Sequence, residues 1–147
     1  MIEHIIHNGE ELALIIRQSF RKKGIEFFTP NDYSQQIGYM SHPKGHLIMP
    51  HVHNPVSRQV RYTKEVLFIK SGRIRIDFYS EEQKYLESRI LASGDVILLA
   101  FGGHGFEMME PTEIIEVKQG PYVGEKDKTR FIGINSDQII FKDDINE

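Results

Sequence analysis

The sequence contains no cysteine. Disulfide bonds and metal sites built on thiolates are therefore excluded. A surplus of basic residues is also lacking, because 18 Lys and Arg stand against 21 Asp and Glu and the formal net charge is -3. Phosphate binding along a nucleic acid needs a concentrated basic face. We therefore do not expect a nucleic acid to be the main partner.

Long apolar runs are absent as well. No run approaches the roughly 20 residues that a membrane-spanning helix needs, so no membrane partner is expected. The opening stretch, MIEHIIHNGEE, lacks a basic segment followed by an apolar core, so we expect no signal peptide and a cytoplasmic location. With 147 residues, 39% hydrophobic and 27% charged, the chain suits a single domain with its own core.

Residues 9–23, GEELALIIRQSFRKK, predict one N-terminal α-helix. Acidic residues open this stretch and basic residues close it, which suits the helix dipole. Gly24 is a natural stop. The apolar residues recur at helical spacing: Leu12, Ile15, Ile16 and Phe20.

After Gly24 the chain consists of short apolar runs separated by turn residues. Such a pattern predicts an all-β sandwich or barrel with antiparallel strands. Residues 73–79, RIRIDFY, alternate strictly, which predicts one buried face and one wet face. The other predicted strands are IEFF, QQIGYM, HLIMPHVH, EVLFIK, YLESRIL, VILLAF and TEIIEVK.

Two histidines stand one residue apart in MPHVH, residues 49–53. On a strand, His51 and His53 point to the same face. Glu65 shares a strand face with Leu67 and Ile69, so its carboxylate is expected to point inward, where it needs a partner or a metal. With His104, these side chains form a nitrogen and oxygen set that suits a divalent first-row metal.

The spacing of these residues resembles the two motifs of the cupin superfamily. GHLIMPHVH (residues 45–53) and EVLFIKSG (65–72) resemble the first motif, and GDVILLAFGGH (94–104) resembles the second. The resemblance covers roughly residues 45–119 and implies a small jelly-roll barrel that holds one metal, with zinc, iron, manganese or nickel as candidates. It also implies the metal ligands: His51, His53, Glu65 and His104.

Residues 54–64, NPVSRQVRYTK, form an insert between the paired histidines and Glu65. We expect a loop at the mouth of the barrel. Arg58 and Arg61 suit an anion clamp because guanidinium groups bind carboxylate or phosphate with two hydrogen bonds. Tyr62 lies beside them and is a further candidate for substrate binding. A solvated loop without a ligand is the alternative.

The tail, residues 114–131, is similar to the end of the cupin domain in bacterial mannose-6-phosphate isomerases. The matching positions include Glu116, Gly124, Glu125 and Arg130, whereas Lys128 stands where that family has an apolar residue. The resemblance makes Arg130 a candidate for gripping substrate. A structural wrap that closes the barrel is the alternative.

Three functions follow as hypotheses. The first is a metal-dependent isomerase acting on a sugar phosphate or nucleotide-linked sugar, with Glu107 or Glu116 as base. The second is a cupin that binds a small acid or sugar without turnover, and the third is an iron-dependent dioxygenase.

The expected organisation is one cupin domain. It has an N-terminal helix and strands in 1–44, the core motifs in 45–119 and a C-terminal wrap in 120–147. We expect a homodimer, because small cupins often pair and the N-terminal segment offers a sheet edge that pairing would cover. Light scattering coupled to size-exclusion chromatography measures the mass of the assembly. A monomer at micromolar concentration would reject the homodimer.

Overall fold

The computed structural model describes residues 1–142 of the chain. The chain divides into two compact units. Residues 1–20 and 63–147 form one, here called the sandwich unit, and Arg21–Tyr62 form the other, here called the hairpin unit. The described residues contain ten strands, two short 3-10 helices and no α-helix. None of their helices is long and apolar enough to cross a bilayer.

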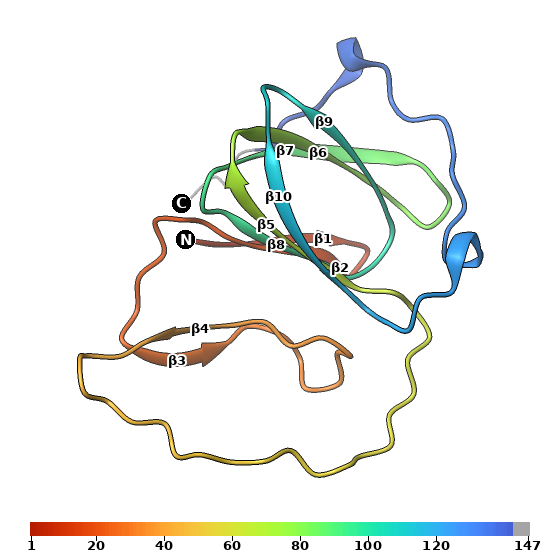
Figure 1. Ribbon diagram of the computed structural model, residues 1–147. Helices are drawn as coiled ribbons and strands as arrows, with labels where there is room; N and C mark the ends of the chain where they lie inside the picture. The colour runs from red at the N-terminus through yellow and green to blue at the C-terminus, as the bar shows by residue number, and fades with distance from the viewer. Residues whose placement is uncertain (143–147) are drawn as a thin grey trace. The chain divides into compact units, whose positions relative to one another are not determined.

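The sandwich unit contains two antiparallel sheets (Figure 1). The larger sheet has the strand order β1-β2-β8-β5-β10, and the smaller has the order β7-β6-β9. All strand pairs within both sheets are antiparallel, as the sequence predicts. The bounds are β1 Ile2–His7, β2 Glu10–Ile16, β5 Glu65–Ser71, β6 Arg73–Tyr79, β7 Tyr85–Ala92, β8 Val96–Leu99, β9 Gly103–Met108 and β10 Glu113–Lys118. The 3-10 helices are η1 Gly124–Asp127 and η2 Ser136–Gln138.

The core of the sandwich unit lies between the two sheets. One apolar cluster draws side chains from β1, β2, β5 and β8 in the larger sheet and from β6 and β7 in the smaller. These side chains expose 4% of their surface or less: Ile5, Leu12, Ala13, Ile15, Leu67, Ile69, Ile74, Ile76, Phe78, Leu91, Ile97 and Leu99. The expectation of an all-β architecture is therefore confirmed for this part of the chain.

The predicted N-terminal helix over residues 9–23 is wrong. Residues 10–16 of this segment form β2, which pairs with β1 on one side and β8 on the other, and the remainder is neither helix nor strand. The run Leu12–Ile16 is buried on both faces of its sheet, and a short, continuous apolar run matches helical and strand spacing equally well. Asn8 and Gly9 form the two-residue hairpin loop with positive φ angles of 51° and 76°, which Asn-Gly adopts readily.

The alternation predicted for β6 is confirmed on its buried face only. Its inward residues belong to the core, but the outer face is not wet. Arg75 and Asp77 are 8% and 6% exposed and form two hydrogen bonds with each other, at 2.8 and 3.1 Å. Tyr79 is also buried, and its hydroxyl accepts a hydrogen bond from the backbone N–H of Ile134. The C-terminal segment thus contributes to covering a face that alternation alone predicts to be solvated.

The hairpin unit contains one two-stranded sheet, formed by β3 Gly24–Phe27 and β4 Gly38–Ser41. The predicted strand over residues 46–53 is wrong, because residues 42–62 contain no strand and are almost entirely exposed. Pro50 and Pro55 lack the N–H group that a ladder needs. The side chains of Leu47 and Met49 are 87% and 82% exposed.

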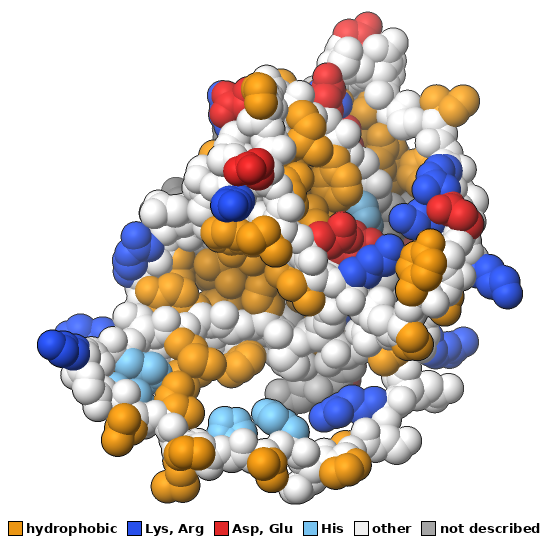
Figure 2. Space-filling model, viewed as in Figure 1, with side chains coloured by type: hydrophobic (Ala, Val, Ile, Leu, Met, Phe, Trp, Pro, Cys, Tyr) orange, Lys and Arg blue, Asp and Glu red, His pale blue; other side chains and the backbone are white. Residues whose placement is uncertain are grey.

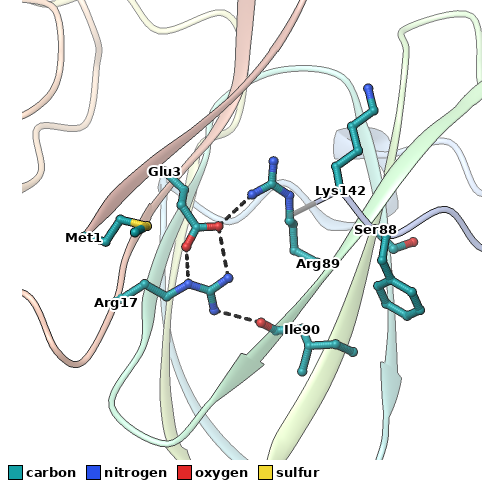
Figure 3. Close-up of a pocket in the computed structure, with 8 residues that line it drawn as sticks. Met1, Glu3, Arg17, Ser88, Arg89, Ile90 and Lys142 are labelled. Atoms are coloured by element: carbon teal, nitrogen blue, oxygen red, sulfur yellow. Dashed lines mark hydrogen bonds and ion pairs between the residues drawn. The ribbon is translucent and has the colours of Figure 1, made fainter. Parts of the chain in front are cut away.

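An ionic cluster ties the ends of several strands of the sandwich unit together (Figure 3). Glu3 on β1 accepts hydrogen bonds from Arg17, at 3.0 Å from Nη2 and also from Nε, and from Arg89 Nη1 at 2.6 Å. Arg17 Nη1 also donates to the Ile90 carbonyl at 2.8 Å and to Asp95 at 3.1 Å. A pocket of about 350 Å³ is lined by Glu3, Arg17, Arg89 and Ile90 together with Met1, Ser88, Phe141 and Lys142.

Candidate acid–base site

Glu65 begins β5 and faces the space between the two sheets. Two and four residues along the same strand, Leu67 and Ile69 are 3% and 0% exposed and belong to the core. Side chains at alternate positions of a strand share a face, so Glu65 points the same way. Its side chain is 15% exposed. The inward direction inferred from the sequence agrees with this placement.

Glu116 on β10 brings a second carboxyl group to Glu65. Strand β10 pairs with β5 so that Glu116 stands opposite Leu67, which places its side chain on the same face as Glu65. Burial raises the pKa of Glu65, and the charge of Glu116 and a hydrogen bond with it raise that pKa further. Glu65 therefore retains its proton to higher pH than an isolated glutamate does.

His104 reaches the same place from the other sheet. It lies on β9 opposite Phe78 of β6, which is 1% exposed, and its Nε2 is 3.7 Å from Oε2 of Glu65. Burial lowers the pKa of His104; the charge of Glu116 opposes this, whereas that of Lys128 adds to it. A lowered pKa favours the neutral imidazole, which can donate one hydrogen bond and accept another.

A glycine just before β9 allows the backbone to come close to β6. Gly102 has a φ of 73°, a conformation that side chains disfavour. A Cβ atom at this position would lie 2.5 Å from the carbonyl oxygen of Tyr79. The close approach of these two backbones brings His104, two residues later, into register with Phe78.

Basic side chains stand next to the acid pair. Lys118 lies opposite Glu65 in the β5–β10 register, and its Nζ is 3.8 Å from Oδ2 of Asp127. Asp127 also accepts a hydrogen bond from the hydroxyl of Thr63. The charges of Lys118 and Lys128 partly offset the rise in the pKa of Glu65. Figure 2 shows acidic and basic side chains beside a histidine on the face it presents.

The four metal ligands implied by the cupin resemblance fall into two pairs. Glu65 and His104 meet in the sandwich unit, as described above. His51 and His53 belong to the hairpin unit, where their ring centroids are 5.2 Å apart and His51 Nδ1 is 2.9 Å from the Met49 carbonyl. Across residues 1–142, no group of three or more His, Asp or Glu side chains is placed to hold a metal ion.

The other predicted site residues lie apart from the acid pair or in the hairpin unit. Glu107 stands opposite Arg75 on the outer face of the smaller sheet and pairs with it at 2.7 Å. Arg130 forms an exposed ion pair with Glu125. Exposed side chains of the hairpin unit complete the set: Arg58, Arg61 and Tyr62.

Sequence reasoning placed Glu116 among the candidates but missed Lys118 and Thr63. Asp127 also matches the tail pattern of the mannose-6-phosphate isomerases, but it was not predicted as a site residue. A signal for Lys118 was present, since it stands two residues after Glu116 in a predicted strand and so shares its face. No signal marked Thr63, because its contact with Asp127 depends on the path of the C-terminal segment.

The arrangement joins two neighbouring carboxyl groups, an imidazole whose lowered pKa favours its neutral form, and nearby ammonium groups. Such a set can accept a proton at one atom and donate one at another, which is the requirement of general acid–base chemistry. Comparisons of the chain with protein-family models, with curated proteins and with solved structures found no match.

Proposed function

We propose that the protein binds a small molecule between its two sheets and transfers a proton on it, in an isomerase-type reaction. The substrate class is a sugar phosphate or a nucleotide-linked sugar. The observation that carries the proposal is the convergence of Glu65, Glu116 and His104 from three strands of two sheets. A cupin jelly roll in the cytoplasm belongs to the same proposal, supported by the stacked antiparallel sheets and by the absence of cysteine.

In this proposal the three side chains have distinct roles. The ionised carboxylate of the Glu65–Glu116 pair takes a proton from the carbon next to a carbonyl group, and the electron pair of that C–H bond forms the double bond of an enediol. The carbonyl oxygen gains the proton that the other carboxyl group holds. His104 donates or accepts a hydrogen bond at the neighbouring hydroxyl. The neighbouring hydroxyl oxygen then loses its proton to the carboxyl group that protonated the carbonyl oxygen, and its C=O bond forms. The proton taken from carbon returns to the former carbonyl carbon, which completes the isomerisation.

Proton transfer of this kind can be observed directly. In D₂O, the parent protein should exchange the C–H hydrogen beside the carbonyl of its substrate, detected by NMR across a panel of hexose phosphates and nucleotide sugars. Glu65→Gln and Glu116→Gln should each slow the exchange about 100-fold or more, the scale of a positioned acid or base.

The matched control is Glu113→Gln, on the same strand β10 but hydrogen-bonded to Ser71 at its far end. This variant should exchange at the parent rate. Exchange that survives both Glu65→Gln and Glu116→Gln would remove the acid–base role. Ligand binding without any exchange would favour the binding module over the enzyme.

A divalent metal belongs to the proposal as well. The 3.7 Å between Glu65 Oε2 and His104 Nε2 allows both atoms to contact one ion at roughly 2.0–2.2 Å each. The cupin resemblance also implies His51 and His53 as ligands, and both belong to the hairpin unit. When bound, the metal would polarise the carbonyl of the substrate.

Elemental analysis tests the metal. Protein purified without added metal should contain close to one divalent ion per chain, and His104→Ala should lose most of it. The matched control is His4→Ala, because His4 pairs with Glu11 at the edge of the larger sheet. A supplemented preparation that still binds no ion would reject the ligand set but leave the acid–base proposal standing.

A further inference from the structure

Two lysines lie close enough to the acid pair for their charges to act on it. Lys118 stands opposite Glu65 across the β5–β10 ladder and shares a strand face with Glu116. Its side chain is 33% exposed. The ammonium group is therefore held near the carboxyl groups while it stays open to solvent and to a ligand.

Lys128 approaches from the C-terminal segment. It directly follows η1, and its N–H donates to the carbonyl of Glu125 at 3.4 Å. Its side chain is exposed, and its charge acts on both Glu65 and His104. Within the described part of the chain, no carboxylate lies within 4 Å of its ammonium group.

The acidic neighbours of the two lysines are the Glu65–Glu116 pair and Asp127. Asp127 faces Lys118 at 3.8 Å, too long for a direct hydrogen bond, and accepts from Thr63 instead. The ammonium donors thus have little competition from carboxylates within hydrogen-bonding distance.

The arginine expected to grip the substrate is engaged elsewhere. Arg130 pairs with Glu125, and both side chains are about 70% exposed. An anion next to the acid pair would therefore meet Lys118 and Lys128 rather than Arg130.

We propose that Lys118 and Lys128 together bind an anionic oxygen group of the ligand, a carboxylate or a phosphate, and thereby place the rest of the ligand against Glu65, Glu116 and His104. This inference rests on the proposed function of the site. Ammonium groups bind such anions through charge-assisted hydrogen bonds. The same two charges repel a bare cation, so a metal at Glu65 and His104 should bind more tightly when the anionic ligand is present.

Titration calorimetry with inorganic phosphate and with malonate tests the lysines directly and distinguishes phosphate from carboxylate as the preferred group. The parent protein should bind at least one of the two, and higher salt should weaken the binding. Lys118→Ala and Lys128→Ala should each weaken it about tenfold or more, as expected for the loss of a hydrogen bond to a charged group. Lys128→Arg should retain most of the affinity because it keeps the charge.

The control is Lys70→Ala on β5, an exposed lysine on the opposite strand face from Ile69. It should bind both anions as the parent does, and circular dichroism should show that every variant is folded. Parent protein that binds neither anion would overturn the inference. Binding that both lysine variants retain in full would overturn it too.

The failure of this inference is distinguishable from failure of the proposed function. Lysine-dependent anion binding without any exchange of substrate hydrogens in D₂O would leave the lysines as an anion site and remove the acid–base role. Exchange that depends on Glu65 and Glu116 but not on either lysine would keep the acid–base role and remove the anion site.

Discussion

Replacing Glu3 by alanine should lower the free energy of unfolding by about 3–5 kcal/mol, the cost of removing one partner from a buried ion pair. The side chains of Glu3 and Arg89 are 6% and 7% exposed, and that of Arg17 is 24% exposed. Without the carboxylate, two guanidinium groups of like charge would face each other with little access to water. Urea unfolding measures the change. The cluster joins β1 to β7 and to the segment after β2, so removing the ion pairs of Glu3 should destabilise both sheets.

The control for this prediction is Glu81→Ala. Glu81 is an exposed residue of the turn after β6. Its replacement should change the free energy of unfolding by no more than about 0.5 kcal/mol. Equal effects of the two substitutions would show that the ion pairs of Glu3 do not stabilise the fold.

The same cluster predicts how stability depends on pH. Burial by itself would raise the pKa of Glu3, but the hydrogen bonds and charges of Arg17 and Arg89 outweigh it and lower the pKa below the ordinary value of 4.5. A carboxyl group whose pKa is lower in the folded state stabilises the fold above its unfolded pKa. That stabilisation is lost as the pH falls from about 4.5 through the folded pKa. Glu3→Ala should therefore flatten the acid limb of the stability curve.

Strand positions could be predicted from the sequence where the apolar pattern fitted a strand and not a helix. Residues 73–79 alternate and form β6, and Glu65 shares the inward face of Leu67 and Ile69 as its parity requires. The run Leu12–Ile16 had two readings, because every position in it is apolar. The hairpin loop Asn8-Gly9 favours the strand, because Asn-Gly is typical of the two-residue loop that joins antiparallel strands.

The candidate site could be predicted only in part. Parity along β5 indicates that Glu65 points inward, but its partner Glu116 follows from the register of β5 with β10, which depends on contacts far apart in the sequence. Likewise, Arg75 and Asp77 have the composition of a solvated face, yet they are buried. Local pattern specifies which face a side chain occupies, and long-range pairing decides what covers that face.

Ile76→Ala should destabilise the protein by about 2–5 kcal/mol. Ile76 is fully buried between the two sheets and stands in register with Arg89 of β7 and Phe106 of β9. Removing its side chain beyond Cβ exchanges apolar contacts for a cavity that neighbouring strands cannot close without distorting the smaller sheet. Urea unfolding measures the loss, and an unchanged slope against urea concentration would show that stability fell while the surface exposed on unfolding did not.

A graded series makes the test of this core position decisive. Ile76→Val removes one methylene equivalent and should cost about 0.5–1.5 kcal/mol, between the parent and alanine. Ile132→Ala makes the same chemical change at a side chain that is 98% exposed. It should therefore stay within about 0.5 kcal/mol of the parent. If Ile132→Ala cost as much as Ile76→Ala, burial between the sheets would not be the source of stability. Because β6 also pairs with the strand that carries His104, Ile76→Ala should in addition weaken any activity that depends on that histidine.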